Sequence, residues 1–189
     1  MPLGAARFGF LGAPDLGELQ LIETKTLASG SPANTLDFSA NNLTPYNVHF
    51  ITYHSLINSG NAEVGFRFYE NGVLESGSVY DYALQYGTTG GTFGESRSQT
   101  NPRAKFGDLT TTSTNSCNGY AYLYNLTDST KYSFTTQHST VWSNSDIYRS
   151  FFGSQVLPQA SAVNKLQVFN FSSGTLESGN FSLYGVKDS

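Results

Sequence analysis

The sequence predicts an all-β protein, an antiparallel β-sandwich with jelly-roll-like connections and about ten strands. Its composition is the first reason: of 189 residues, 14% are aromatic and only 13% are charged, and Tyr, Phe and Thr favour pleated, half-buried strands. The second reason is an alternation of apolar and polar residues that recurs along the chain, with no window that sustains a helical period. The third is the frequency of Gly, Asn and Ser, which supply the turns between short strands.

The start of the chain differs in composition from the rest. Residues 1–16 are rich in Gly, Ala and Pro and carry only isolated aromatic side chains. Such a segment has too little apolar surface to form an ordered element alone. We therefore expect an extended N-terminal anchoring arm over residues 1–16 and one β-sandwich domain over residues 17–189, because a chain of this length most simply forms a single core.

Three strands are expected in the first third of the chain. Leu19 begins a strand that runs to about Leu27 and is ended by Gly30-Ser31-Pro32, and residues 36–38 form a short second strand. Residues 46–57 give the clearest period-two run. The side chains that this run places on one face are Val48, Phe50, Thr52, His54 and Leu56.

A hairpin is expected next. Residues 64–69 alternate and run into Asn71-Gly72, which is a strong hairpin signal because both turn residues must tolerate positive φ. Residues 79–86 form the following strand. One face of that strand carries Tyr80, Tyr82, Leu84 and Tyr86.

Two later segments show no alternation. Residues 87–107 are rich in Gly, Thr and Ser and predict a long loop, which at such a length is usually functional or mobile. Residues 142–160 predict a second irregular segment. The remaining expected strands are 110–114 at an edge, 120–124 after a turn at Asn118-Gly119, 132–141 after a turn at 127–130, and a closing pair over 163–171 and 180–186.

Charge and cysteine content exclude several classes of partner. A net charge of −4, with the ten Lys and Arg spread thinly, argues against nucleic acid. No apolar stretch approaches the ~20 residues that span a membrane, and the N-terminal stretch lacks the pattern of a signal peptide, so we expect a soluble protein made in a cytoplasm. Cys117 is alone, which excludes an intrachain disulfide. A buried, inert thiol is favoured there, and its position in Asn-Ser-Cys-Asn-Gly leaves a partly exposed thiol open.

No motif in the sequence is specific for catalysis or metal binding. His49 and His54 project to opposite faces of one strand and cannot share a metal, and we expect a structural role for them and for His138. Acidic residues on neighbouring strands leave glycoside hydrolysis as a weak alternative. They are Glu63, Glu70, Glu75 and Asp81. The sequence therefore predicts a non-enzymatic protein with no catalytic, cofactor-binding or metal-binding residue.

Aromatic side chains are the remaining clue to function, because Tyr, Trp and Arg anchor interfaces and stack on sugars. The residues expected to form an interface or a glycan contact are Tyr80, Tyr82, Arg97, Trp142, Tyr148, Arg149 and Phe151, with Phe152 in the same irregular segment. The residues expected in the core are Phe50, Phe66, Phe68, Phe134, Phe169 and Phe171.

Several segments follow a pattern shared with a known family. They are Phe8-Gly9-Phe10, Leu19 to Leu27, the aromatic strand after Pro45, Tyr80-Asp81-Tyr82, Gly119 to Leu126, and Phe169 to Gly185 with its Ser/Gly-rich turn between two apolar runs. In these segments the chain resembles a family of small β-rich virion proteins of tailed bacteriophages, common in phages of cyanobacteria and other aquatic bacteria. The resemblance spans nearly the whole chain, and its ending is the most specific part.

The resemblance implies a non-enzymatic building block on the outside of a phage particle. Because the chain has one domain, a predicted arm and no shaft-like repeat, we expect a capsid decoration or cement protein, located in the virion and assembled in the host cytoplasm. The expected partners are the major capsid protein or tail proteins, and a homo-oligomer such as a trimer would fit. The arm residues expected to dock on a neighbouring subunit are Arg7, Phe8, Phe10 and Leu11. The alternative is a tail-fibre or tail-associated receptor-binding protein that recognises host glycan.

Overall fold

The structure is a computed structural model that describes residues 18–38, 43–59, 63–107, 115–142, 147–171 and 174–187. Within these ranges the chain forms β-strands and turns and no helix. The strands are β1 (Leu19–Leu27), β2 (Thr35–Phe38), β3 (Val48–Asn58), β4 (Val64–Glu70), β5 (Val73–Leu74), β6 (Tyr80–Thr88), β7 (Phe93–Asn101), β8 (Ala104–Gly107), β9 (Cys117–Tyr124), β10 (Ser133–Trp142), β11 (Tyr148–Leu157), β12 (Val163–Asn170) and β13 (Leu176–Val186).

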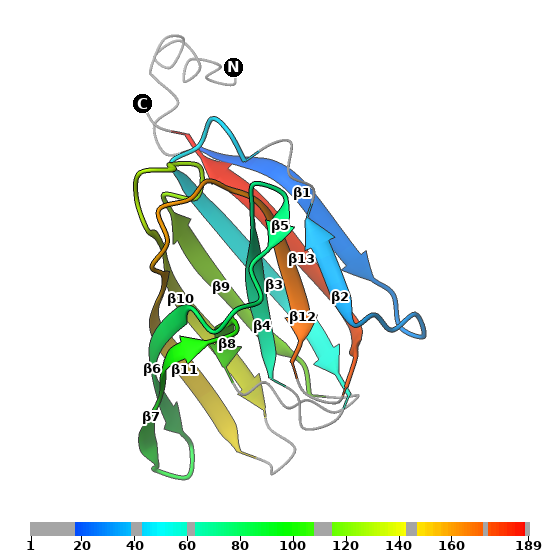
Figure 1. Cartoon of the computed structure of the whole chain (residues 1–189). Coiled ribbons are helices and arrows are strands. Elements are labelled where there is room, and N and C mark those ends of the chain that lie inside the picture. Colours follow the sequence, from blue (N-terminus) through cyan, green and yellow to red (C-terminus); the bar gives the residue numbers. More distant parts are fainter. Residues whose placement is uncertain are drawn as a thin grey trace, which may run out of the picture.

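The strands form two antiparallel sheets that pack face to face (Figure 1). The large sheet has eight strands in the order β1-β13-β3-β9-β10-β11-β6-β7. The small sheet has the order β2-β12-β4-β5, and β8 pairs with β4 beside it. The predicted antiparallel β-sandwich is confirmed, whereas the jelly-roll order of its connections stays a prediction.

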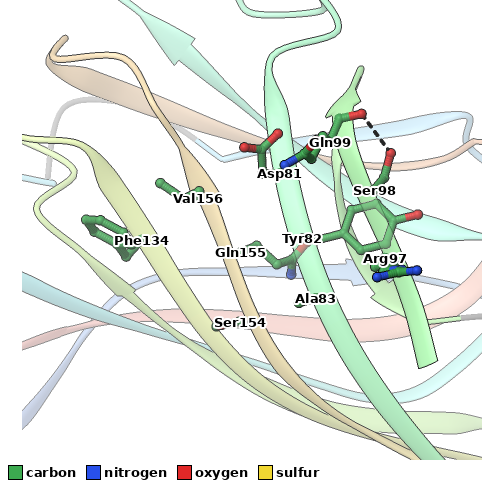
Figure 2. A pocket seen from close by; sticks show the side chains of 10 residues that line it. All are labelled: Asp81, Tyr82, Ala83, Arg97, Ser98, Gln99, Phe134, Ser154, Gln155 and Val156. Carbon is green, nitrogen blue, oxygen red and sulfur yellow. Dashed lines mark hydrogen bonds between the residues drawn. The ribbon is translucent and has the colours of Figure 1, made fainter. Parts of the chain in front are cut away.

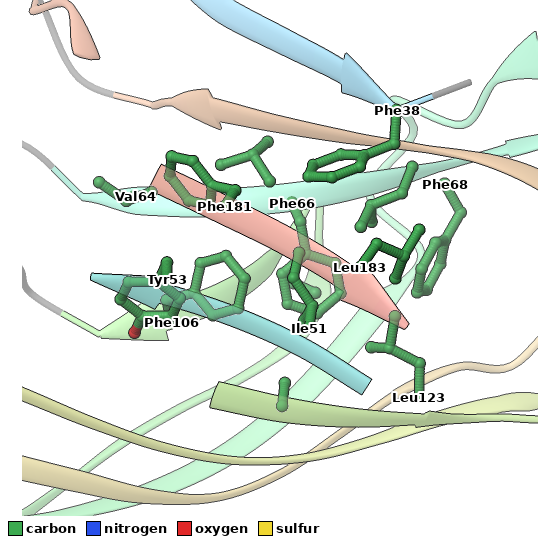
Figure 3. Close-up of a cluster of buried hydrophobic side chains, with 14 of the residues drawn as sticks. Phe38, Ile51, Tyr53, Val64, Phe66, Phe68, Phe106, Leu123, Phe181 and Leu183 are labelled. Atoms are coloured by element: carbon green, nitrogen blue, oxygen red, sulfur yellow. The ribbon is translucent and has the colours of Figure 1, made fainter. Parts of the chain in front are cut away.

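The core lies between the two sheets and is rich in aromatic rings (Figure 3). Phe106 sits at its centre, with its ring centroid 4.8 Å from those of both Tyr53 and Phe66. Phe181 and Leu183 of β13 are fully buried beside them. Burying such large rings supplies most of the favourable free energy of the fold.

β8 pairs with β4, and side chains of the large sheet form hydrogen bonds to its backbone. Gln155 on β11 accepts from the Lys105 amide and donates to the Lys105 carbonyl, the latter bond at 2.8 Å. Gln137 and Ser139 on β10 both donate to the Phe106 carbonyl. Buried backbone amides and carbonyls need hydrogen-bond partners, and these buried polar side chains provide them for β8.

The alternation of β3 is interrupted by a bulge. His49, Ile51 and Tyr53 face the core, on the face opposite to Phe50, which was expected to be buried. Ser55 has a φ of 55° and the register shifts after Tyr53. The extra residue turns Leu56 onto the core face, where it is fully buried. The prediction that Leu56 shares a face with Val48 and Phe50 is therefore wrong.

The expected hairpin at Asn71-Gly72 is confirmed. These residues have φ values of 50° and 86° and join β4 to β5 in a tight turn, with Glu70 paired to Val73. Positive φ at both positions suits a two-residue hairpin, which is why the Asn-Gly signal is strong.

The two segments predicted to be irregular contain strands instead. Residues 87–107 hold the end of β6, the edge strand β7 and β8, and residues 142–160 hold β11. After the exposed Phe93, β7 contains only small, polar and charged residues, and it is the last strand of the large sheet, with little apolar surface to bury. Both predictions of a long irregular segment are wrong for that reason.

Two further expectations can be compared with the structure, and two lie outside it. Asn118-Gly119 lies inside β9 and is not a turn. The two expected closing strands are present as β12 and β13. They belong to different sheets, and β13 lies between β1 and β3. The expected arm over residues 1–16 and the edge strand at 110–114 lie outside the described residues.

Candidate functional site

The outer face of the large sheet, opposite the core, carries exposed aromatic side chains in place of the usual charged ones. Across β13, β3 and β9 lies a patch that we call the aromatic plate, in which Tyr120 and Tyr122 are exposed and the other three residues, Tyr184, Phe50 and Tyr124, are half-buried. The strand register places Tyr184 opposite Phe50 and Phe50 opposite Tyr122. Cross-strand aromatic neighbours on one face stabilise each other and here form a continuous surface.

The rings of the aromatic plate are in contact. The ring centroid of Phe50 lies 4.7 Å from that of Tyr122, 5.7 Å from that of Tyr120 and 6.2 Å from that of Tyr184. The Tyr124 hydroxyl shares a hydrogen bond of 3.2 Å with the Thr136 hydroxyl. Such distances are typical of favourable aromatic pairs, so the plate is a packed surface and not a set of separate rings.

A second pattern lies next to the aromatic plate, on the outer face of β10 and β11. The cross-strand pairs there alternate between pairs with an aromatic ring and pairs of hydroxyls, and we call them the aromatic–hydroxyl ladder. In order, the pairs are Phe134–Val156, Thr136–Ser154, His138–Phe152, Thr140–Ser150 and Trp142–Tyr148. The side chains of Phe134, Trp142 and Phe152 are each 45–50% exposed.

A depression of about 670 Å³ adjoins one end of the ladder (Figure 2). Ala83 and Ser154 are cross-strand neighbours on its floor, and their small size leaves the space open. Phe134 lies on one side of the floor, on β10, and Arg97 on the other, on β7. The remaining lining residues are Asp81, Tyr82, Ser98, Gln99, Gln155 and Val156.

Charged groups occur only at the β7 side of the depression. Arg97 Nε lies 3.1 Å from Glu95 Oε1 in an exposed ion pair. Asp81 Oδ1 accepts a hydrogen bond of 3.0 Å from the Thr100 amide. The five pairs of the ladder include no Asp, Glu, Lys or Arg. The surface therefore suits an uncharged occupant with hydroxyl groups and apolar faces.

The structure separates the residues predicted for an interface into two groups. Tyr82 and Arg97 line the depression, and Trp142 and Tyr148 form the last pair of the ladder. Arg149 is half-buried. Arg97, Trp142 and Tyr148 are on the outer face of the large sheet, whereas Tyr82 and Arg149 pair with the inward-facing Gln155 and Val141.

Two of the predicted interface residues are in the core instead. Tyr80 is fully buried, accepts a hydrogen bond of 3.0 Å from the Phe68 amide and donates to the Glu75 carbonyl. Burial also raises the pKa of its hydroxyl. Phe151 is 1% exposed and packs on Tyr86. Neither can contact a partner, because the core side of the large sheet is covered by the other sheet and by β8. The arm residues Arg7, Phe8, Phe10 and Leu11 lie outside the described residues.

The expected core list is correct in part. Phe66, Phe68 and Phe169 are buried, whereas Phe134 and Phe171 are 45% and 42% exposed. Phe50 is half-buried in the aromatic plate. The exposed Phe93 and Phe134 were missed as surface residues, whereas Phe152, named with the possible interface segment, is 50% exposed. The alternation of residues along β10 indicates that Phe134 is on one face of a strand. It does not indicate which of the two faces a second sheet covers, so the exposure of Phe134 could not be predicted.

The acidic residues considered for glycoside hydrolysis are held in structural contacts. Glu63 forms ion pairs with the buried Arg103 and Lys105, with 3.2 Å to Lys105 Nζ. Arg103 also stacks over the Phe171 ring at 3.2 Å. Both buried cations therefore have a carboxylate partner, and an unpaired buried charge would be strongly destabilising.

Glu70 and Glu75 lie close to each other at the end of β4. The Gln159 amide satisfies both carboxylates in the orientation in which its nitrogen donates to them, with 3.2 Å to Glu75 Oε2. Burial raises the pKa of Glu70, and the neighbouring Glu75 adds to the effect. This arrangement joins the β4–β5 hairpin to the segment that precedes β12.

His49 and Cys117 are buried and have no exposed polar surface. His49 Nε2 donates a hydrogen bond of 2.8 Å to the Leu43 carbonyl, and burial lowers the ring's pKa from its ordinary value. Cys117 is fully buried in β9, and burial raises the pKa of its thiol, so the favoured interpretation of an inert thiol is confirmed.

Among the described residues, no group of three or more His, Cys, Asp or Glu side chains is placed to hold a metal ion. No helix in the described ranges has the length and hydropathy needed to span a bilayer.

Comparisons with known proteins add no relative. The chain matches no family model, no curated protein and no solved structure.

Proposed function

We propose that this protein is a non-enzymatic structural protein of a bacteriophage virion, a capsid decoration or cement protein on the outer surface of the particle. The observation that carries the proposal is the aromatic plate on the outer face of β13, β3 and β9. Contiguous exposed aromatic surface on a soluble domain is typical of a site that binds another protein. The sequence resemblance to small phage virion proteins supplies the biological setting.

The shape of the aromatic plate suits a broad protein partner. Its rings lie at the middle of a large sheet and are held by mutual contact, so little side-chain entropy is lost when a partner covers them. Tyrosine adds a hydroxyl that can bond to the partner at the rim of each ring. The partner in this proposal is the major capsid protein, and a symmetric homo-oligomer on the shell fits the same setting.

The predicted arm adds a second attachment. Arg7, Phe8, Phe10 and Leu11 would anchor it on a neighbouring subunit. Deleting residues 1–16 is then expected to lower incorporation into particles, and unchanged incorporation would exclude an anchoring role for the arm.

The test is quantitative mass spectrometry of purified particles, with copy number expressed relative to the major capsid protein. A copy number comparable to that of the capsid protein supports head decoration. Tyr122→Glu is expected to lower that number about tenfold or more, because a charge would be buried without a partner. Val73→Glu is the matched control, since Val73 is an exposed apolar residue on β5 of the small sheet. Absence of the wild-type protein from particles would overturn the proposal.

The second candidate function is a tail-fibre or tail-associated receptor-binding protein that recognises host glycan. The exposure of Trp142 and the depression lined by Phe134, Asp81 and Arg97 favour this candidate. Aromatic rings beside a few polar groups are the usual lining of small-molecule and sugar sites. A copy number far below that of the capsid protein would favour this candidate over decoration.

A further inference from the structure

We infer that the aromatic–hydroxyl ladder of β10 and β11, with the adjoining depression, is a binding track for an extended, uncharged polysaccharide. The inference rests on the second candidate function, glycan recognition, and names the site and the class of glycan. It does not involve the aromatic plate.

The regular alternation of the ladder is the first argument. Pairs that hold Phe134, Phe152 or Trp142 recur every four residues, and pairs of Thr with Ser lie between them. At about 3.4 Å per residue, neighbouring aromatic pairs are about 14 Å apart and the ladder is about 27 Å long. A polysaccharide presents apolar ring faces and hydroxyl groups in regular succession along its length, so an extended chain can contact both kinds of pair. A monosaccharide would cover only a fraction of this length.

The hydroxyl-bearing pairs argue for a glycan over a protein partner. Ser150 and Ser154 recur in the ladder, whereas serine is depleted at protein interfaces. Hydroxyl groups both donate and accept hydrogen bonds, which matches the hydroxyl groups of a sugar. Ser150 already bonds to His138 Nε2 at 2.8 Å, so this pair is held in a fixed orientation. A fixed polar group costs less entropy on binding than a mobile one.

Charge argues for an uncharged glycan. No ladder residue is an Asp, Glu, Lys or Arg, and the Arg97 guanidinium at the border of the depression is already paired with Glu95. The other charge there is Asp81, which carries negative charge next to the track. Along the described part of this surface an anionic polymer would meet two carboxylates, Asp81 and Glu95, and an Arg97 guanidinium that is already paired, so its binding is disfavoured.

The depression gives the track a defined end. Ala83 and Ser154 form its floor, and Phe134, the first aromatic residue of the ladder, lies beside it. Gln99 and Asp81 at the opposite side supply an amide and a carboxylate. One sugar unit can therefore sit in the depression while the chain continues over Phe152 towards Trp142.

The test is native gel electrophoresis of the full chain through gels that contain a dissolved polysaccharide. The uncharged probes are dextran, a mixed-linkage β-glucan, a galactomannan and an arabinoxylan, and the anionic probe is dextran sulfate. We expect at least one uncharged polymer to retard the wild-type protein and dextran sulfate not to do so. Trp142→Ala and Phe152→Ala are each expected to weaken the retardation about tenfold. Val73→Ala, at an exposed apolar residue on β5 of the small sheet, is the control and should be retarded like the wild type.

Several outcomes would overturn the inference. They are no retardation by any uncharged probe, retardation by dextran sulfate alone, and equal retardation of the ladder variants and the wild type. A further contradicting outcome can be measured by sedimentation of the same proteins. If the ladder variants lose self-association but bind glycan like the wild type, the ladder is a protein interface. Thermal unfolding followed by circular dichroism verifies that the exposed substitutions leave the fold intact.

The particle measurement keeps this inference separate from the proposed function. If the ladder variants lose glycan retention but enter particles in normal number, the ladder and the aromatic plate have separate roles. If the wild-type protein enters particles normally but no uncharged glycan binds, only the present inference fails.

Discussion

The two faces of the large sheet are built from the same strands and from similar residues, yet only one is a core. The inner face carries Tyr53, Phe151 and Phe181, all at most 2% exposed, and the outer face carries Phe134, Phe152 and Trp142, at 45–50%. The two faces differ in exposure because the small sheet and β8 pack only on the inner face. The number of aromatic residues in a strand therefore does not tell whether they serve stability or binding.

The largest expected difference between the faces is in stability. Phe181→Ala removes a fully buried ring that packs against Tyr53, and we expect it to lower the free energy of unfolding by about 3–5 kcal/mol. Denaturant titration of the purified domain measures the change. A loss below about 1 kcal/mol would mean that the inner face is less tightly packed than the structure shows.

A smaller effect is expected from adding volume to the inner side of the sheet. A Cβ atom on Gly119 would lie 2.5 Å from the Tyr53 hydroxyl oxygen and 2.7 Å from the His138 carbonyl oxygen. We expect Gly119→Ala to cost about 1–3 kcal/mol, as overpacked sites do. Gly90→Ala is the matched control, because the nearest atom to its new Cβ is 3.7 Å away in an exposed turn. Similar stability of the two variants in denaturant would contradict the close contact at Gly119.

A third effect appears only on acidification. Burial lowers the pKa of His49 below its ordinary value of 6.5, so below that pH the unfolded chain binds a proton that the folded ring does not. Stability due to His49 is therefore complete above pH 6.5 and falls as the pH drops towards the folded pKa, by at most about 1.4 kcal/mol per pH unit. We expect His49→Gln to flatten the curve of unfolding free energy against pH in this range. An unchanged slope would show that His49 is not the group responsible.

The smallest expected effect on stability is on the outer face. Phe152→Ala removes a ring that is 50% exposed, and we expect the free energy of unfolding to change by less than about 1 kcal/mol. The same denaturant titration measures it beside Phe181→Ala. A loss as large as that of Phe181→Ala would remove the distinction between the two faces.

Much of the fold was predictable because strong local patterns coincide with strands. The run that became β3 and the Asn71-Gly72 turn were identified from alternation and turn chemistry. β7 and β11 were missed for a physical reason. Glu95, Arg97 and their neighbours on β7 belong to an edge strand with no apolar side to signal it, and β11 mixes Gly153 and Ser154 with its aromatic residues.

The candidate site was predictable only in its residue types. Trp142, Tyr148, Tyr82 and Arg97 were selected for their chemistry, and the structure places them on or beside one continuous surface. The ladder itself depends on the register between β10 and β11, which pairs residues up to 24 positions apart. Single-sequence periodicity contains no information on such pairing, so Phe151 could not be distinguished from Phe152 until the covered face was known.

The pairing of β1 with β13 has a consequence for how the chain reaches its native state during translation. Thr24 and Ser182 contact across 158 positions of sequence, and β13 also supplies the second neighbour of β3. A ribosome that has made only the first three quarters of the chain leaves β1 without its partner strand and one edge of β3 open. Closure of the sandwich must therefore wait for late synthesis, and with so many distant contacts we expect slow folding and a nascent chain that depends on protection against premature aggregation.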